Sequence, residues 1–193
     1  VNDIRSAAES ALGEFTAHHV QTIGVIANRV EPAILDQTEE ALRELTHLAV
    51  GALPADPLLI APTLRAQFES VGATQVLGNP DLLDRESQHA LVAAMTLPNV
   101  LSRLVTEATV IMPGDRSDLL PGLILAHHSG SFPQLTGVIL TGGYPIPENV
   151  VKLFDGMHLD LPIGMTDQGT YTTAHDVFNT HGHFTSSPRK VET

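Results

Sequence analysis

Residues 109–118, TVIMPGDRSD, and residues 137–143, GVILTGG, decide the fold of this chain. Each stretch starts with a short apolar run rich in β-branched residues, ends in turn residues, and is followed by apolar residues at helical spacing. Both therefore predict a buried strand that continues through a loop into a helix. Because the carboxyl ends of parallel strands meet at one edge of a sheet, we expect both loops at that edge, where open α/β sheets bind ligands.

The remainder of the chain alternates between the same two patterns. Helices are expected at residues 2–17, 32–45, 63–71, 98–104, 117–128, 147–154 and 171–178, and strands at 22–27, 48–53, 74–77, 91–95, 109–112, 136–140 and 162–165. Strands that alternate with helices of this length predict an α/β fold with a mostly parallel sheet and flanking helices.

A proline-rich stretch that contains Pro54, Pro57 and Pro62 marks the expected domain boundary. We expect a small αβαβ unit over residues 1–54, the main domain over residues 55–185 and a polar tail over residues 186–193. The first unit is too small to close a doubly covered sheet, so the chain is expected to be a fragment of a longer one.

Composition excludes several classes of function. The 193 residues carry a formal net charge of −12, and the only lysines are Lys152 and Lys190, so the surface would repel nucleic acid. The absence of cysteine excludes a disulfide framework, a thiolate nucleophile and cysteine-ligated metal. No apolar run has the length of a membrane span and no secretion signal occurs, so we expect a cytoplasmic protein without membrane contact.

The first loop carries charges of both signs at Asp115, Arg116 and Asp118. One interpretation is purely structural: Ser117 caps the next helix, and the carboxylates offset its dipole, which is worth about 1 kcal/mol. The other is functional, because a guanidinium at a strand end suits an anionic ligand or a carboxylate of a neighbouring subunit.

The second and third loops add glycines and hydroxyls. Thr141, Gly142 and Gly143 form either a simple turn or a nest of N–H groups for an anion, whereas Thr170 is expected to cap a helix and Tyr171 to line a cleft or pack. A P-loop fingerprint is absent, which argues against nucleotide hydrolysis. Three such loops at one edge predict a shared ligand pocket or subunit contact.

The sequence offers no catalytic or metal site. The ten histidines include the pairs His18-His19 and His127-His128, but none has the spacing of a helical zinc motif. No serine lies in a Gly-x-Ser-x-Gly elbow. We therefore assign no catalytic residue, no metal ligand and no cofactor.

An ordered set of motifs over about residues 55 to 180 resembles the DRTGG domain of long-form phosphate acetyltransferases. The motifs are Pro54–Leu59, Ala61–Thr63, Val92–Leu101, Pro113–Asp118, Leu140–Gly143 and Thr170–Ala174. Residues 1–54, with GVIANRV at residues 24–30, resemble the end of the dethiobiotin-synthetase-like P-loop domain that precedes it in those enzymes. One departure is that DQGTY at residues 167–171 replaces the usual Asp-Thr-Asp-Thr-Tyr run, which weakens the case for a cation or ligand site there.

The resemblance implies a parent enzyme of acetate metabolism that exchanges acetyl between coenzyme A and phosphate, using a C-terminal domain that this chain lacks. The chain is then expected to be inactive alone, a regulatory and assembly segment. Its expected partners are that catalytic domain of the same polypeptide, further copies in a homo-oligomer, and a small anionic effector. The alternative is a small metal- or phosphate-dependent hydrolase or acyl-transfer enzyme that uses Asp115 and Asp118.

Overall fold

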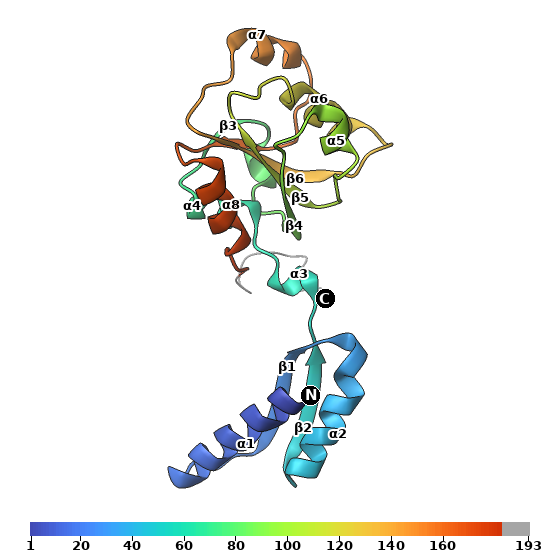
Figure 1. The fold of residues 1–193 in the computed structure, drawn as a ribbon, viewed down its shortest axis with the longest axis vertical. Coiled ribbons are helices and arrows are strands. Elements are labelled where there is room, and N and C mark those ends of the chain that lie inside the picture. Colours follow the sequence, from blue (N-terminus) through green and yellow to red (C-terminus); the bar gives the residue numbers. More distant parts are fainter. Residues whose placement is uncertain (183–193) are drawn as a thin grey trace. The chain divides into compact units, whose positions relative to one another are not determined.

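The structure, a computed structural model, describes residues 1–182 and divides after Asp56 into two compact units (Figure 1). Each unit contains its own sheet, with two strands in the first and five in the second. The last part of the domain expected over residues 55–185, and the tail expected over residues 186–193, lie outside the described residues.

The first unit has the expected αβαβ order. Its elements are α1 (Asn2–Ala17), β1 (Gly24–Val30), η1 (Pro32–Ile34), α2 (Leu35–Leu45) and β2 (Ala49–Pro54). β1 and β2 pair in parallel, and α2 connects them as the crossover helix with Thr38 and Leu42 buried. The helix expected at residues 32–45 starts with a 3-10 turn, which suits Pro32 because a first turn needs no backbone donor there.

The second unit is an α/β layer structure, and the expected fold class is confirmed. Its elements are α3 (Pro57–Ile60), α4 (Leu64–Ser70), β3 (Thr74–Leu77), η2 (Pro80–Leu82), β4 (His89–Val92), α5 (Leu97–Leu101), β5 (Ala108–Pro113), α6 (Leu120–His128), β6 (Leu135–Thr141), α7 (Glu148–Val151), η3 (Lys152–Phe154), β7 (Ile163–Met165) and α8 (Thr170–Phe178). The strand order is β3-β7-β6-β5-β4. β4, β5, β6 and β7 are mutually parallel, and β3 pairs antiparallel with β7.

Alternation along the central strands builds one core on each face of this sheet. Val110 and Met112 of β5 belong to the core that includes α5 and α6, whereas Ile111 belongs to the core of α4 and α8. Figure 1 shows these helix pairs on opposite sides of the sheet. A Cβ at Gly137 would lie 2.5 Å from Leu64, and one at Gly164 would lie 2.5 Å from Phe68, so the missing side chains let α4 pack close to β6 and β7.

Two expected helix caps are wrong. The helix expected at residues 117–128 begins at Leu120, and neither Ser117 nor any other side chain caps it. Pro121 lies in its first turn, where the missing N–H costs nothing, and the preceding residues form turns instead. Thr170 is the first residue of α8 and Gly169 occupies the cap position, because the Thr170 hydroxyl bonds elsewhere.

The last turn of α6 carries a buried histidine. The side chain of His127 is 3% exposed; its Nδ1 accepts the backbone N–H of Leu135 at 3.0 Å, and its Nε2 lies 3.4 Å from Asp160 Oδ1. Burial lowers the pKa of His127 below the ordinary value of 6.5, against the opposing attraction of Asp160. The neutral ring therefore joins α6 to the start of β6.

Protonation of His127 is expected to destabilise the fold. Because the pKa of His127 is lower in the folded chain, the unfolded chain binds the proton first, and the free energy of unfolding falls as pH drops below 6.5 by at most about 1.4 kcal/mol per pH unit. Urea denaturation over this pH range should show a smaller fall for His127→Gln than for the unchanged chain. His18→Gln, at an exposed site, is the control. Equal pH dependence in the unchanged chain and His127→Gln would contradict this account.

Candidate functional site

Three loops meet at the carboxyl ends of β5, β6 and β7, as the sequence predicts. We call residues 114–118, 141–143 and 166–170 the loop rim. Gly114 N–H donates to Thr141 O at 2.8 Å and Thr166 N–H donates to Leu140 O at 2.9 Å, so each loop is bonded to the neighbouring strand end. Since β5, β6 and β7 are adjacent and parallel, the loops form one continuous layer.

The two consecutive glycines of the loop rim fasten β6 to the loop after β7. Gly142 has φ +87° and Gly143 has φ +68°, a left-handed region that glycine tolerates. Gly142 N–H donates to Gln168 O at 2.8 Å, and Gly143 N–H donates to Thr166 O at 2.9 Å. Both donors are therefore used inside the protein, and this turn does not present them to an anion.

Threonine hydroxyls hold the same loops from the inside. Thr141 is only 1% exposed, and its Oγ1 lies 2.7 Å from Thr170 Oγ1. Thr166 Oγ1 donates to Val71 O at 2.6 Å, which ties the third loop to the residue after α4. Thr141, Thr166 and Thr170 thus form the supporting part of the rim rather than an open surface.

The charged residues form the exposed part of the rim. Arg116 makes a two-point contact with Asp118, with Nε–Oδ1 at 2.9 Å and Nη2–Oδ2 at 3.0 Å. Their side chains are 32% and 63% exposed. The hydrogen bonds from Arg116 lower the pKa of Asp118, and those to Asp118 raise the pKa of Arg116. Asp115 is exposed next to this pair.

Both tyrosines of the chain also lie at this edge. Tyr171 is 86% exposed and Tyr144 is 53% exposed. A Cβ on Gly142 would approach the Tyr144 ring to 2.8 Å, so the glycine leaves room for the ring. Sequence reasoning missed Tyr144, although its position directly after the two glycines was a signal. The exposed rim is therefore acidic and aromatic, with one guanidinium that already has a carboxylate partner.

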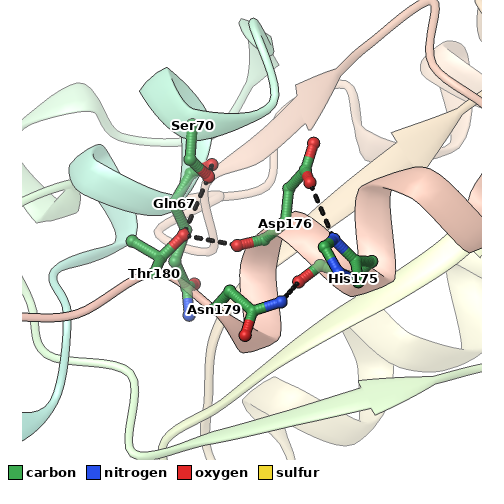
Figure 2. A network of polar contacts seen from close by, with 6 residues as sticks. All are labelled: Gln67, Ser70, His175, Asp176, Asn179 and Thr180. Atoms are coloured by element: carbon green, nitrogen blue, oxygen red, sulfur yellow. Dashed lines mark hydrogen bonds and ion pairs between the residues drawn. The ribbon is translucent and has the colours of Figure 1, made fainter.

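A separate groove lies between α4 and α8 and contains none of the predicted site residues. It has a volume of about 850 Å³ and is lined by Ala66, Glu69, Ser70, Asp176, Asn179, Thr180 and His181. Figure 2 shows Thr180 Oγ1 beside Ser70 Oγ, at 2.9 Å, and beside the Asp176 carbonyl, at 2.8 Å. No sequence motif indicates this groove, because Ser70 and Thr180 are 110 residues apart and serine and threonine are common on exposed helices.

Residues 1–182 contain no candidate metal site. His127 and His128 each place Nε2 at 3.4 Å from Asp160 Oδ1, yet no group of three or more His, Asp or Glu side chains in this range could hold an ion. Within the same range, no helix combines the length and apolarity that crossing a membrane requires.

Comparison with known proteins identifies the domain. The model of the DRTGG domain family matches residues 68–180. The name spells Asp-Arg-Thr-Gly-Gly, the order in which Asp115, Arg116, Thr141, Gly142 and Gly143 occur along this chain. A solved structure of the CBS and DRTGG domains of the regulatory region of Clostridium perfringens pyrophosphatase is similar in fold, with a TM-score of 0.50 and 15% identity over 66% of this chain and 52% of that chain.

Several full-length relatives are phosphate acetyltransferases. The enzyme of Synechocystis sp. is 32% identical over 86% of this chain and 24% of its own length. The enzymes of Nitratidesulfovibrio vulgaris and Pseudomonas putida are 32% and 30% identical over 76% and 81% of this chain, and over 21% and 24% of their own lengths. The chain therefore spans about a quarter of the length of these relatives. It belongs to the DRTGG domain family, and over most of its length it is similar to the corresponding region of phosphate acetyltransferases.

Proposed function

We propose that this chain is a non-catalytic regulatory and assembly segment of a phosphate acetyltransferase, an enzyme that converts acetyl-CoA and phosphate into coenzyme A and acetyl phosphate. The observation that carries the proposal is the match to phosphate acetyltransferases over 86% of the chain but only 24% of the relative. In this view the catalytic domain belongs to the same polypeptide outside the matched region, residues 1–54 end a P-loop-type domain, and the protein works in the cytoplasm.

The chemistry of the loop rim supports a non-catalytic role. The hydroxyls of Thr141 and Thr170 bond to each other, and the N–H groups of Gly142 and Gly143 bond to carbonyls. A nucleophile needs a base within hydrogen-bond reach, and an oxyanion needs unused donors aimed at it. These four residues offer neither, because their polar groups already stabilise the loops.

The same arrangement disfavours the alternative, a hydrolase or acyl-transfer enzyme built on Asp115 and Asp118. Both oxygens of Asp118 accept hydrogen bonds from Arg116, and its pKa is lowered, so it is a poor general base. No observation on the described residues favours that function.

Regulation by an anionic effector agrees with the exposed half of the rim. The Clostridium perfringens structure describes a DRTGG domain within a regulatory region that is complexed with an activator, diadenosine tetraphosphate. In this chain, Arg116 is the cation of the rim loops that such a ligand would meet. Because Asp118 already holds Arg116, binding would require exchange of that carboxylate for a phosphate group.

An enzyme assay tests the proposed function directly. Acetyl phosphate formation from acetyl-CoA and phosphate should be undetectable with a purified protein of residues 1–193, because the proposed role of this region is non-catalytic. The Synechocystis phosphate acetyltransferase, measured in parallel, provides the positive control. Turnover by the isolated chain near that of the relative would refute the proposal.

Substitutions of Arg116 and of Asp118 should change the affinity for an anionic ligand in opposite directions. Asp118→Asn frees Arg116 and should strengthen binding of diadenosine tetraphosphate, whereas Arg116→Ala should abolish it. Titration calorimetry measures both, and urea denaturation should show that Arg116→Ala leaves stability unchanged, since the side chain lies at the surface. Equal affinity in the two variants would show that the effector does not bind at this rim.

A further inference from the structure

One edge of the five-stranded sheet has unused backbone groups. β4 pairs only with β5 among the described strands. The N–H groups of His89 and Ala93 point toward β5, donating to Glu107 O at 3.4 Å and Ile111 O at 2.8 Å. Because directions alternate along a strand, Leu91 also faces β5, and the N–H and C=O groups of Ala90 and Val92 face outward. The structure gives these four groups no hydrogen bond within residues 1–182.

The free part of this edge has a clear beginning. Just before β4, Thr63 forms an antiparallel bridge with Glu86, and Ser87 N–H donates to Pro62 O at 2.8 Å. Residues 62–63 therefore occupy the outer side only up to Ser87. From Ala90 to Val92, no segment of residues 1–182 pairs with the outer side of the strand.

The opposite edge of the sheet is irregular, whereas the β4 edge is regular. The pairing of β3 with β7 shifts register between Gln75 and Leu77, and Gln75 Nε2 donates to the carbonyls of Leu77 and Gly78 at 3.2 and 3.0 Å. Irregular pairing of this kind keeps an edge from adding strands. β4 has regular register and contains no proline, aspartate, glutamate, lysine or arginine.

The three residues that follow His89 in β4 are apolar on both faces of the sheet. Ala90 and Val92 lie with Val177 in the core of α4 and α8, and Leu91 lies in the opposite core. Phe178 is 61% exposed, and it shares with Ala90 the lining of a cavity of about 100 Å³. In a chain of net charge −12, this neutral strip is a place where two copies can approach without opposing carboxylates.

We propose that β4 pairs antiparallel with β4 of a second copy of this chain, around a twofold axis at Leu91. Antiparallel pairing of a strand with itself is automatically symmetric. Ala90 then stands opposite Val92 of the second copy, and Val92 opposite Ala90, so that each pair exchanges two N–H···O=C bonds. All four outward groups are satisfied, and the sheet continues across the axis. The pairing gives a specific surface for the assembly role in the proposed function, and the inference rests on that proposed function.

Cross-linking tests the register, because the chain has no native cysteine. At the axis, Leu91 faces its own copy in a non-hydrogen-bonded pair with Cα atoms about 4.5 Å apart, inside the range of about 4.4–6.8 Å for disulfides. Leu91→Cys should form a disulfide-linked dimer on mild oxidation. The matched control is Val76→Cys on β3, a 39% exposed site that should form no disulfide-linked dimer. Cross-linking of Leu91→Cys no faster than that of Val76→Cys would overturn the proposal.

Sedimentation equilibrium provides a second, independent test. The unchanged chain should associate to dimers, and Ala90→Pro should be monomeric with an unchanged circular dichroism spectrum. Proline removes the outward N–H and puts its ring at that edge, while the N–H groups of His89 and Ala93, which point toward β5, remain. A monomeric unchanged chain, or a dimeric Ala90→Pro variant, would overturn the pairing. Neither experiment measures acetyl phosphate, so failure here is distinguishable from failure of the proposed function.

Discussion

Backbone hydrogen bonds between the loops that follow β5, β6 and β7 are the constraint on which the candidate site depends. Gly114 N–H bonds to Thr141 O, Gly142 N–H to Gln168 O and Gly143 N–H to Thr166 O. Each bond links one strand end to the next, so the three loops form one hydrogen-bonded layer. The positive φ angles of Gly142 and Gly143 aim their N–H groups at the third loop, which a residue with a Cβ would do only under strain.

These hydrogen bonds divide the loop rim into groups that support the loops and groups that a partner can contact. The supporting groups are glycine amides and threonine hydroxyls that are already hydrogen-bonded within the protein, and the groups that a partner can reach are Asp115, Arg116, Asp118, Tyr144 and Tyr171. Because the Arg116–Asp118 pair is exposed, its own contribution to stability is small, and its value lies in holding the guanidinium in a defined position. In this rim Asp118 positions Arg116, and an anionic ligand could replace Asp118 as its partner. Such an arrangement suits a regulatory contact better than catalysis.

Sequence reasoning predicted the parts of this arrangement that depend on local pattern. The runs at 109–112, 136–140 and 162–165 are strands, and the three loops after them meet at one edge, because apolar periodicity and βαβ connectivity determine both. The caps assigned to Ser117 and Thr170 were wrong. Pro121 in the first turn of α6, and the contact of Thr170 with Thr141, decide where these helices begin.

Features that depend on contacts between distant segments could not be predicted from the sequence. Two consecutive glycines are compatible with an anion-binding nest and with a turn whose N–H groups bond inside the protein. The structure shows the second arrangement, because these N–H groups donate to the carbonyls of Gln168 and Thr166. The antiparallel direction of β3 and the groove between Ser70 and Thr180 have the same origin, since each arises where segments far apart in the chain meet.

Amide hydrogen exchange of the glycines tests most directly the claim that the loop rim is locked from inside. We predict that the amides of Gly142 and Gly143 exchange only with opening free energies close to that of global unfolding, because both are bonded inside the protein. Gly130, which follows α6 and has no hydrogen bond among the described residues, should exchange rapidly. Exchange of Gly142 and Gly143 within about tenfold of an unprotected amide would contradict the account and would return these two donors to a ligand.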